Sequence, residues 1–174
     1  ATGGRVDSAR VSVPKFGRSE ASRASAQARK AELPEAKSTR GSGGASGQNG
    51  KTVRKVLGKV DTTNTKQVDA LKNSFCSGYA KSDVEHMMVI TKDGEVHYMT
   101  DNNPRGVDCS YLGGKLEGSY NIHTHPPKTT QYSFSTDADI PGAFADGTAV
   151  MEAVDYKYRY RFVIPENITF EQWE

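Results

Sequence analysis

Apolar residues spaced three or four apart predict one amphipathic helix in the second third of the chain. The residues that share this face are Val68, Leu71, Phe75 and Tyr79. Thr63 or Asn64 offers a side-chain oxygen that can cap the first turn. Gly78 weakens the last turn, so we predict that the helix ends close to it.

Two runs of β-type residues, 84–91 and 95–100, lie on either side of the tripeptide Lys92-Asp93-Gly94. An Asp-Gly pair between two such runs is typical of a tight hairpin turn, so we predict two antiparallel strands here. Residues 51–62 also carry three valines and one leucine at short intervals. This segment is compatible with either a short helix or an edge strand that joins the fold.

The rest of the chain alternates loops with short elements. Residues 101–117 contain Pro104 and three glycines and are predicted to form a long loop. We expect a strand over residues 116–123, a second loop over 124–135, a short helix from Asp137 or Asp139 to Phe144, and strands at 148–154 and 159–164. This order predicts an α/β domain with a mixed central sheet flanked by helices, over residues 51–174.

Residues 1–50 differ sharply in composition from the rest. They are rich in Gly, Ser and Ala and hold nine Lys and Arg against four Asp and Glu, whereas residues 51–174 hold fourteen against seventeen. Such a segment buries too little apolar surface to offset its ordering entropy. We therefore predict a disordered, basic leader or linker that acts as a solvated tether, and we do not expect nucleic acid as a partner.

Composition also limits the setting in which the protein acts. The chain has no apolar run of about 18 residues or more, so we expect no membrane span. It begins with Ala, which suggests a part of a larger polypeptide. Cys76 and Cys109 are too few and too far apart for a disulfide framework. The compartment stays open: the cytoplasm is favoured, with a secreted effector or a virion-associated protein as the alternatives.

The candidate chemistry centres on His123 and His125, at the end of a predicted strand. Residues i and i+2 of an extended strand point to the same side, so both imidazoles can face one point. An aspartate from the following element could complete a set of three ligands and leave a fourth position for water. That is the ligand pattern of a catalytic zinc site.

The order of these residues resembles a known family. Glu85 at the start of a predicted strand, then a hairpin, then His-x-His-Pro at 123–126, then a Ser/Thr–Asp pair that opens a helix, is similar to the JAMM (MPN+) zinc metalloproteases. The bacterial, phage and toxin-associated branches, including RadC-like domains, are most similar. The resemblance implies a JAMM/cytidine-deaminase-like fold and zinc-dependent hydrolysis of an amide or isopeptide bond. It also implies a protein or peptide substrate, which in the family is often a ubiquitin-like tail linked to lysine.

The loop behind the histidines departs from the family pattern. The family spacing would place the hydroxyl at Ser133 and the aspartate at 136, where this chain has Thr136. Thr136 with Asp139 keeps the two-residue gap, Ser135 with Asp139 needs one extra residue, and Ser133 with Asp137 is a weaker third option. We favour Asp139 as the ligand because an apolar helical turn follows it.

The resemblance assigns each residue a role. The metal ligands would be His123, His125 and Asp139, with Zn²⁺ lowering the pKa of its bound water to about 7. Glu85 would act as the general base that moves the proton of that water to the leaving amine. Ser135 or Thr136 would donate a hydrogen bond to the oxyanion, worth roughly 3 kcal/mol.

Other interpretations compete with this one. A phage-morphogenesis or toxin-associated binding module with a vestigial metal site is the main alternative. We expect His86 and His97 to be surface or sheet histidines. A Cys–His peptidase built on Cys109 would leave the second histidine and the aspartate unexplained. The alternating aromatic and charged residues 155–161 suggest a peptide or nucleic-acid groove, but a half-buried strand with its tyrosines on one face is favoured.

Overall fold

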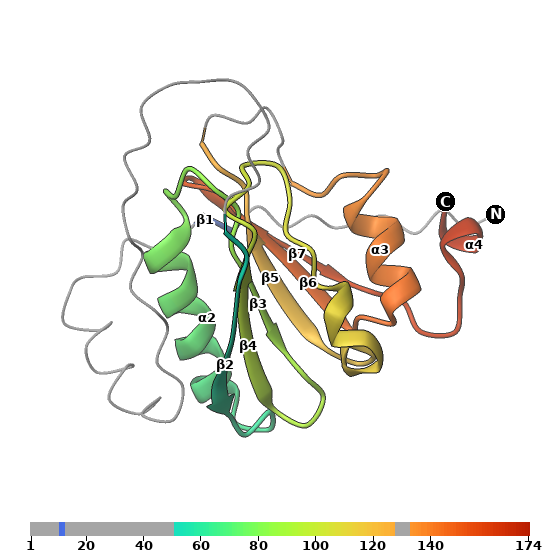
Figure 1. The fold of residues 1–174 in the computed structure, drawn as a ribbon. Helices are drawn as coiled ribbons and strands as arrows, with labels where there is room; N and C mark the ends of the chain where they lie inside the picture. Colours follow the sequence, from blue (N-terminus) through green and yellow to red (C-terminus); the bar gives the residue numbers. More distant parts are fainter. Residues whose placement is uncertain (1–10, 13–50, 128–132) are drawn as a thin grey trace.

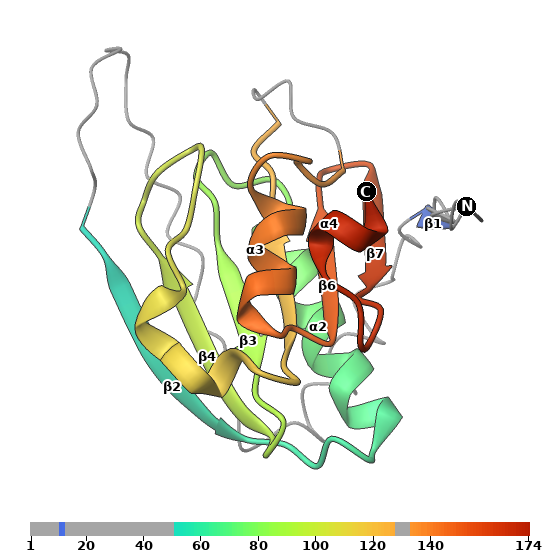
Figure 2. The same cartoon turned by 90° about the vertical axis from the view of Figure 1, so that its right-hand side faces the viewer.

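The computed structural model describes residues 11–12, 51–127 and 133–174 of the chain. A central sheet has α2 (Thr65–Tyr79) on one face, and the 3₁₀ segment η1 (Ser110–Leu116) and α3 (Asp139–Asp146) on the other (Figure 1). A view from the side shows η1 and α3 next to each other in front of the sheet, with α2 behind it (Figure 2). The predicted fold class, a mixed sheet flanked by helices, is confirmed.

The sheet has seven strands in the described residues, in the order β1-β7-β6-β5-β3-β4-β2. Their bounds are β1 Val11–Ser12, β2 Val53–Lys59, β3 Met87–Ile90, β4 Glu95–Thr100, β5 Tyr120–Thr124, β6 Val150–Val154 and β7 Tyr158–Val163. Neighbouring strands are antiparallel except β5 and β6, which run parallel. A parallel pair needs a crossover, and the chain segment between β5 and β6 provides it with α3.

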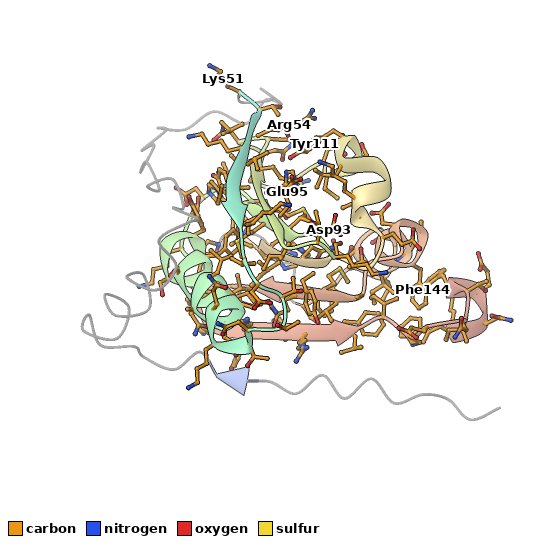
Figure 3. The ribbon with its side chains drawn as sticks, turned by 90° about the horizontal axis from the view of Figure 1, so that it is seen from below. Lys51, Arg54, Asp93, Glu95, Tyr111 and Phe144 are labelled. Atoms are coloured by element: carbon orange, nitrogen blue, oxygen red, sulfur yellow. The ribbon has the colours of Figure 1, made fainter. Side chains whose placement is uncertain are left out.

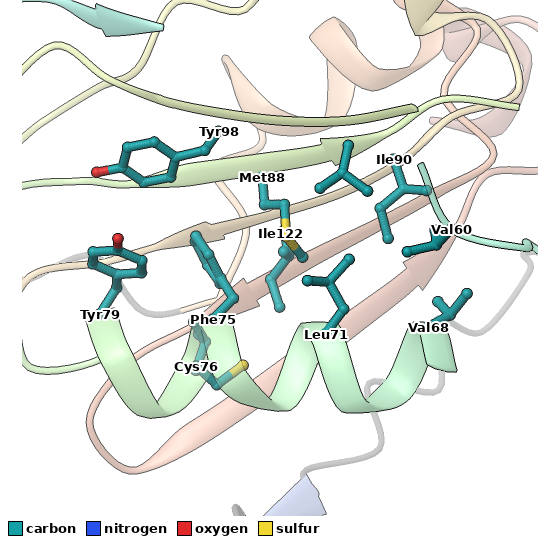
Figure 4. Packing of buried hydrophobic residues seen from close by; sticks show 12 residues of the cluster. Val60, Val68, Leu71, Phe75, Cys76, Tyr79, Met88, Ile90, Tyr98 and Ile122 are labelled. Atoms are coloured by element: carbon teal, nitrogen blue, oxygen red, sulfur yellow. The ribbon is translucent and has the colours of Figure 1, made fainter. Parts of the chain in front are cut away.

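Helix α2 forms as its apolar spacing predicts. The side chain of Asn64 caps it by accepting a hydrogen bond from the backbone N–H of Gln67. Its apolar face packs onto the sheet residues Met88, Ile90 and Ile122, and Figure 4 shows this cluster. Burying one large side chain such as Phe75 stabilises the fold by about 1.5–3 kcal/mol. This cluster is the main hydrophobic core on that face.

The hairpin of β3 and β4 is also confirmed, and it positions the edge strand. At the turn, Gly94 has φ of 89°, and a Cβ atom there would lie 2.0 Å from the carbonyl oxygen of Val60. The backbone N–H of Val60 donates to Gly94 at 2.8 Å, which joins the end of β2 to the turn. Residues 53–59 are therefore an edge strand paired with β4, and Val56 on it is 64% exposed.

The region predicted as a long loop contains η1, which is a difference from the prediction. Leu112 and Leu116 of η1 are buried against Met87, Val89 and Met99 of the sheet. Two adjacent glycines lower the local helix propensity, so tertiary burial, which the local sequence does not reveal, stabilises this segment. Strand β5 accordingly begins at residue 120, later than predicted, because η1 extends to residue 116.

A contact between β2 and η1 reinforces this layer. The guanidinium of Arg54 lies 4.0 Å from the ring centroid of Tyr111 (Figure 3). The edge strand is thereby tied to the segment that covers the sheet.

The C-terminal elements close the same face. Helix α3 ends at Gly147, which has a left-handed conformation with φ of 69°. Phe144 of α3 contacts Phe170 and Trp173 of the short helix α4 (Phe170–Trp173). These aromatic contacts hold α3 against the sheet, where the candidate site lies.

Strand β7 confirms the favoured interpretation of residues 155–161 only in part, because Tyr156 lies before the strand and is exposed. Tyr160 and Phe162 are buried on one face, while Arg161 between them is exposed. Arg159 and Lys72 of α2 both form ion pairs with the buried carboxylate of Glu152, each at 3.0 Å. This buried charge cluster links α2 to β6 and β7.

The leader is described at only two residues. Val11–Ser12 form β1 and pair with β7, a strand that the sequence did not predict. The rest of the predicted disordered leader lies outside the described residues. Within the described parts of the chain, no helix is long and apolar enough to cross a membrane.

Candidate metal centre

Strand β5 carries His123, and His125 follows directly after its end. As the alternation of a strand requires, both rings lie on the same side, with their Nε2 atoms 3.0 Å apart. The two side chains are buried, with only 4% and 2% of their surfaces exposed. The backbone N–H of His125 donates to the carbonyl of Val154 at 2.9 Å, which anchors it to β6.

The first residue of α3, Asp139, completes the group. Its Oδ1 lies 3.7 Å from Nε2 of His123, and its Oδ2 lies 3.9 Å from Nε2 of His125. The three ligand atoms fall within 4.8 Å of one another. Ligands bound at about 2.0–2.1 Å around a tetrahedral ion are about 3.3–3.4 Å apart, so this set fits a metal ion. Asp137, the other aspartate considered, is exposed and does not belong to the group.

Ser135 holds the Asp139 carboxylate in place. Its backbone N–H donates to Oδ2 of Asp139, and its Oγ accepts from the backbone N–H of Asp139, both at 2.8 Å. Burial favours a raised pKa for Asp139, but the nearby imidazole of His123, aided by the Ser135 N–H, outweighs it and lowers the pKa to about 2. The carboxylate is therefore ionised at neutral pH, as a ligand must be.

His125 is also in the protonation state that a metal ligand requires. Burial, aided by the nearby His123, lowers the pKa of His125 to about 4, so its imidazole is neutral and has a lone pair at neutral pH. Nδ1 of His123 is buried with no hydrogen-bond partner among the described residues. The donor set of two imidazoles and one carboxylate is one that zinc commonly takes.

Glu85 also lies at the candidate metal site, although it comes from the segment that precedes β3. It lies two residues before β3, held by a hydrogen bond from its backbone N–H to Asn103 and by Thr100, whose hydroxyl donates to its carbonyl. It is 6% exposed. Burial raises the pKa of its carboxyl to about 7, with His123 lowering it and Asp139 raising it.

A cleft of about 260 Å³ joins these residues. One end of the cleft is lined by Glu85, His123, Ser135 and Asp139, and we call it the metal end because the candidate ligands lie there. This end lies between α3 and the loop that leads to η1. Thr136, the alternative hydroxyl, is exposed and does not line it. Among the described residues, Ser135 is thus the hydroxyl that meets the cleft, and the hydrogen bond that its Oγ accepts leaves its own O–H hydrogen to donate.

The other histidines and the cysteines either lie outside the cleft or are unreactive at neutral pH. His86 is buried in the core, bonded to Ser82 and Tyr98 at 2.8 Å, and His97 on β4 pairs with Glu95. Cys109 does line the cleft, but burial, aided by nearby carboxylates, raises the pKa of its thiol to about 11. A thiolate nucleophile is therefore scarce at neutral pH. Cys76 is buried in the core beside Phe75 on α2.

Two residues of the cleft were missed by sequence reasoning. Asn121 lies two positions before His123 on β5, and Asp146 lies seven positions after Asp139 on α3. The two-residue repeat of a strand places Asn121 on the same side as His123. The helical repeat places Asp146 on the same side as Asp139. The periodic spacing around the candidate ligands was the signal that could have identified them.

Comparisons with known proteins do not extend this picture. No protein-family model, no curated protein and no solved structure matches the chain. The function must therefore be argued from the geometry of the site.

Proposed function

We propose that the protein is a zinc-dependent hydrolase of amide or isopeptide bonds that acts on a protein or peptide substrate. The observation that carries this proposal is the convergence of a buried carboxyl, Glu85, on the cleft that holds the His123–His125–Asp139 group. A structural metal site needs no such additional acid and is closed by a fourth protein ligand. The resemblance to the JAMM metalloproteases in the order of these residues gives the same reaction class.

The three ligands would hold the ion on one side of the cleft. A bound Zn²⁺ would act as a Lewis acid, polarising a carbonyl and making water a nucleophile near neutral pH. His125 is neutral and Asp139 is ionised without any further adjustment. The cost of preparing the ligands for the ion is therefore small.

Glu85 would accept the proton of the attacking water and pass it to the nitrogen of the leaving amine. Its burial makes it a stronger base than an exposed glutamate, which suits proton transfer at neutral pH. Ser135 would donate its hydroxyl hydrogen to the developing oxyanion. Its two hydrogen bonds with Asp139 hold that hydroxyl in a defined position before substrate arrives.

The test combines metal content with cleavage. The full chain is purified with zinc and its metal content measured, and cleavage is followed with fluorogenic peptide amides and lysine-linked isopeptides. We expect about one zinc per chain, loss of zinc in His123→Ala, and a loss of about 10²–10⁴-fold in kcat/KM for Glu85→Gln with zinc retained. Asp137→Asn is the matched control and keeps both zinc and activity.

Three results would contradict the proposal. A wild-type chain without zinc removes the metal chemistry, and full activity in Glu85→Gln removes the general base. Zinc binding without any cleavage would favour the alternative, a binding module with a vestigial metal site.

A further inference from the structure

The cleft continues beyond the metal-binding group along one side of α3. Asp139, Gly142, Ala143 and Asp146 all line it, and their spacing places them on one stripe of the helix. Seven residues of helix correspond to about 10 Å of length. The small side chains in the middle leave room for a slender chain between the metal end and the Asp146 end.

Asp146 is an uncompensated carboxylate at that far end. It is the last residue of α3, where the helix dipole is negative and disfavours an acid. No hydrogen bond or ion pair to its side chain is present in the described residues. Partial burial and the nearby Asp108 raise its pKa. A cation placed beside it would relieve each of these costs.

Asn121 provides an independent observation in the same cleft. Its side chain is 6% exposed, and its Oδ1 has no hydrogen-bond partner in the described part of the chain. A buried acceptor without a donor has lost its bond to water without a replacement, which destabilises the fold. The fold tolerates this cost at a position that faces a cleft, where a ligand can supply the donor.

Asp146 and Cys109 both line the cleft, and Asp146 lies close enough to Cys109 to raise the pKa of that thiol. A bound chain would therefore meet the negative charge of Asp146 inside the cleft.

We propose that Asp146, about 10 Å along α3 from Asp139, and the side-chain oxygen of Asn121, two residues before His123 on β5, form a subsite for a cationic group of the substrate, of the ammonium type. The substrate class is then a peptide or isopeptide that carries a lysine-like amine. This inference deepens the proposed function and rests on it.

The experiment measures binding rather than turnover, so it remains informative if the hydrolase proposal fails. The full chain carrying Glu85→Gln, loaded with zinc, is titrated with two capped peptides, acetyl-Gly-Gly-Lys-Gly-Gly-amide and its norleucine counterpart. The two differ only in the ammonium group. We expect the lysine peptide to bind about tenfold more tightly at low salt, and this preference to fall as salt screens the charge.

Variants assign the effect to the subsite. Asp146→Asn is expected to reduce the preference to below about twofold while leaving the norleucine peptide unaffected. Asp93→Asn is the matched control, because it removes the same charge from an exposed turn in which Asn-Gly is equally favoured (Figure 3). It should keep the full preference.

The inference is overturned by equal affinity for the two peptides, by a preference that Asp146→Asn leaves intact, or by no binding of the lysine peptide at millimolar concentration. If the Asp146 variant does not fold, salt dependence decides instead: a lysine preference that high salt leaves unchanged also overturns the inference. Absence of cleavage by the wild-type chain would count against the hydrolase proposal alone.

Discussion

Ser135 and Asp139 bind each other twice. The backbone N–H of Ser135 donates to the carboxylate of Asp139, and the backbone N–H of Asp139 donates to the hydroxyl oxygen of Ser135, each at 2.8 Å. This pair both begins α3 and aims a candidate metal ligand. The local structure and the position of this candidate ligand are therefore coupled at one turn of the chain.

Replacement of Ser135 should accordingly affect both properties. Ser135→Ala removes the acceptor for the Asp139 N–H, and we expect a loss of about 1 kcal/mol in the free energy of unfolding and weaker zinc binding. Urea unfolding and chelator competition measure the two effects. Thr136→Ala, an exposed neighbour, is the control and should change neither. Equal behaviour of the two variants would show that the reciprocal pair does not matter.

By the proposed function, zinc should stabilise the whole domain, because the candidate site exists only in the folded chain. At a free zinc concentration about 100 times the Kd, the gain is about 2.7 kcal/mol. For a domain of this size that corresponds to a rise of about 10 °C in Tm. His123→Ala should abolish the shift and Asp137→Asn should keep it, as measured by calorimetry with and without zinc. A shift that persists in His123→Ala would place the ion elsewhere.

His86 should make stability depend on pH. Burial lowers the pKa of His86 to about 4 from its ordinary 6.5. Between these values the unfolded chain binds a proton that the folded chain does not, so this contribution to stability is present above about pH 6.5 and is lost as the pH falls towards 4. We expect the wild type to lose about 2 kcal/mol more than His86→Gln between pH 7 and pH 4.5. Urea unfolding at both pH values checks this, and parallel losses in the two proteins would contradict it.

The buried charges around Glu152 should be intolerant of change. Lys72 and Arg159 both pair with Glu152 at 3.0 Å, and the Lys72–Glu152 pair is almost fully buried. Glu152→Gln leaves a buried ammonium without its counter-charge, so we expect a loss of about 3–5 kcal/mol in the free energy of unfolding. Lys115→Ala breaks a more exposed pair with Glu95, which water screens, and should cost much less. Comparable losses in the two variants would show that burial does not set the difference.

Replacement of Asn121 should affect the stability of the fold and the binding of the lysine peptide differently. Because its buried Oδ1 has no partner among the described residues, Asn121→Leu is expected to keep or raise the free energy of unfolding, by up to about 1 kcal/mol. The same change should weaken binding of the lysine peptide relative to the norleucine peptide. A large loss of stability, seen by urea unfolding, would mean that Asn121 is a structural residue.

Several elements could be predicted from the chain because local signals and tertiary packing agree there. The apolar spacing and Asn64 cap of α2, the Asp-Gly turn between β3 and β4, and the Asp-Gly end of α3 all act within a few residues. The same-side placement of His123 and His125 is likewise a property of any extended strand. The element order and the α/β class follow from these signals.

Contacts between distant segments needed the folded chain. The sequence of η1 contains two adjacent glycines, which do not favour a helix. Its two leucines stabilise the segment only because the folded sheet provides an apolar surface that buries them. The choice of Asp139 over Asp137 depends on the direction in which α3 returns to β5. Strand order, the parallel pairing of β5 and β6, and the presence of Glu85, Asn121 and Asp146 in one cleft depend on contacts between residues far apart in the chain. Periodicity and turn chemistry specify which residues share a face of an element, whereas long-range packing specifies which faces meet.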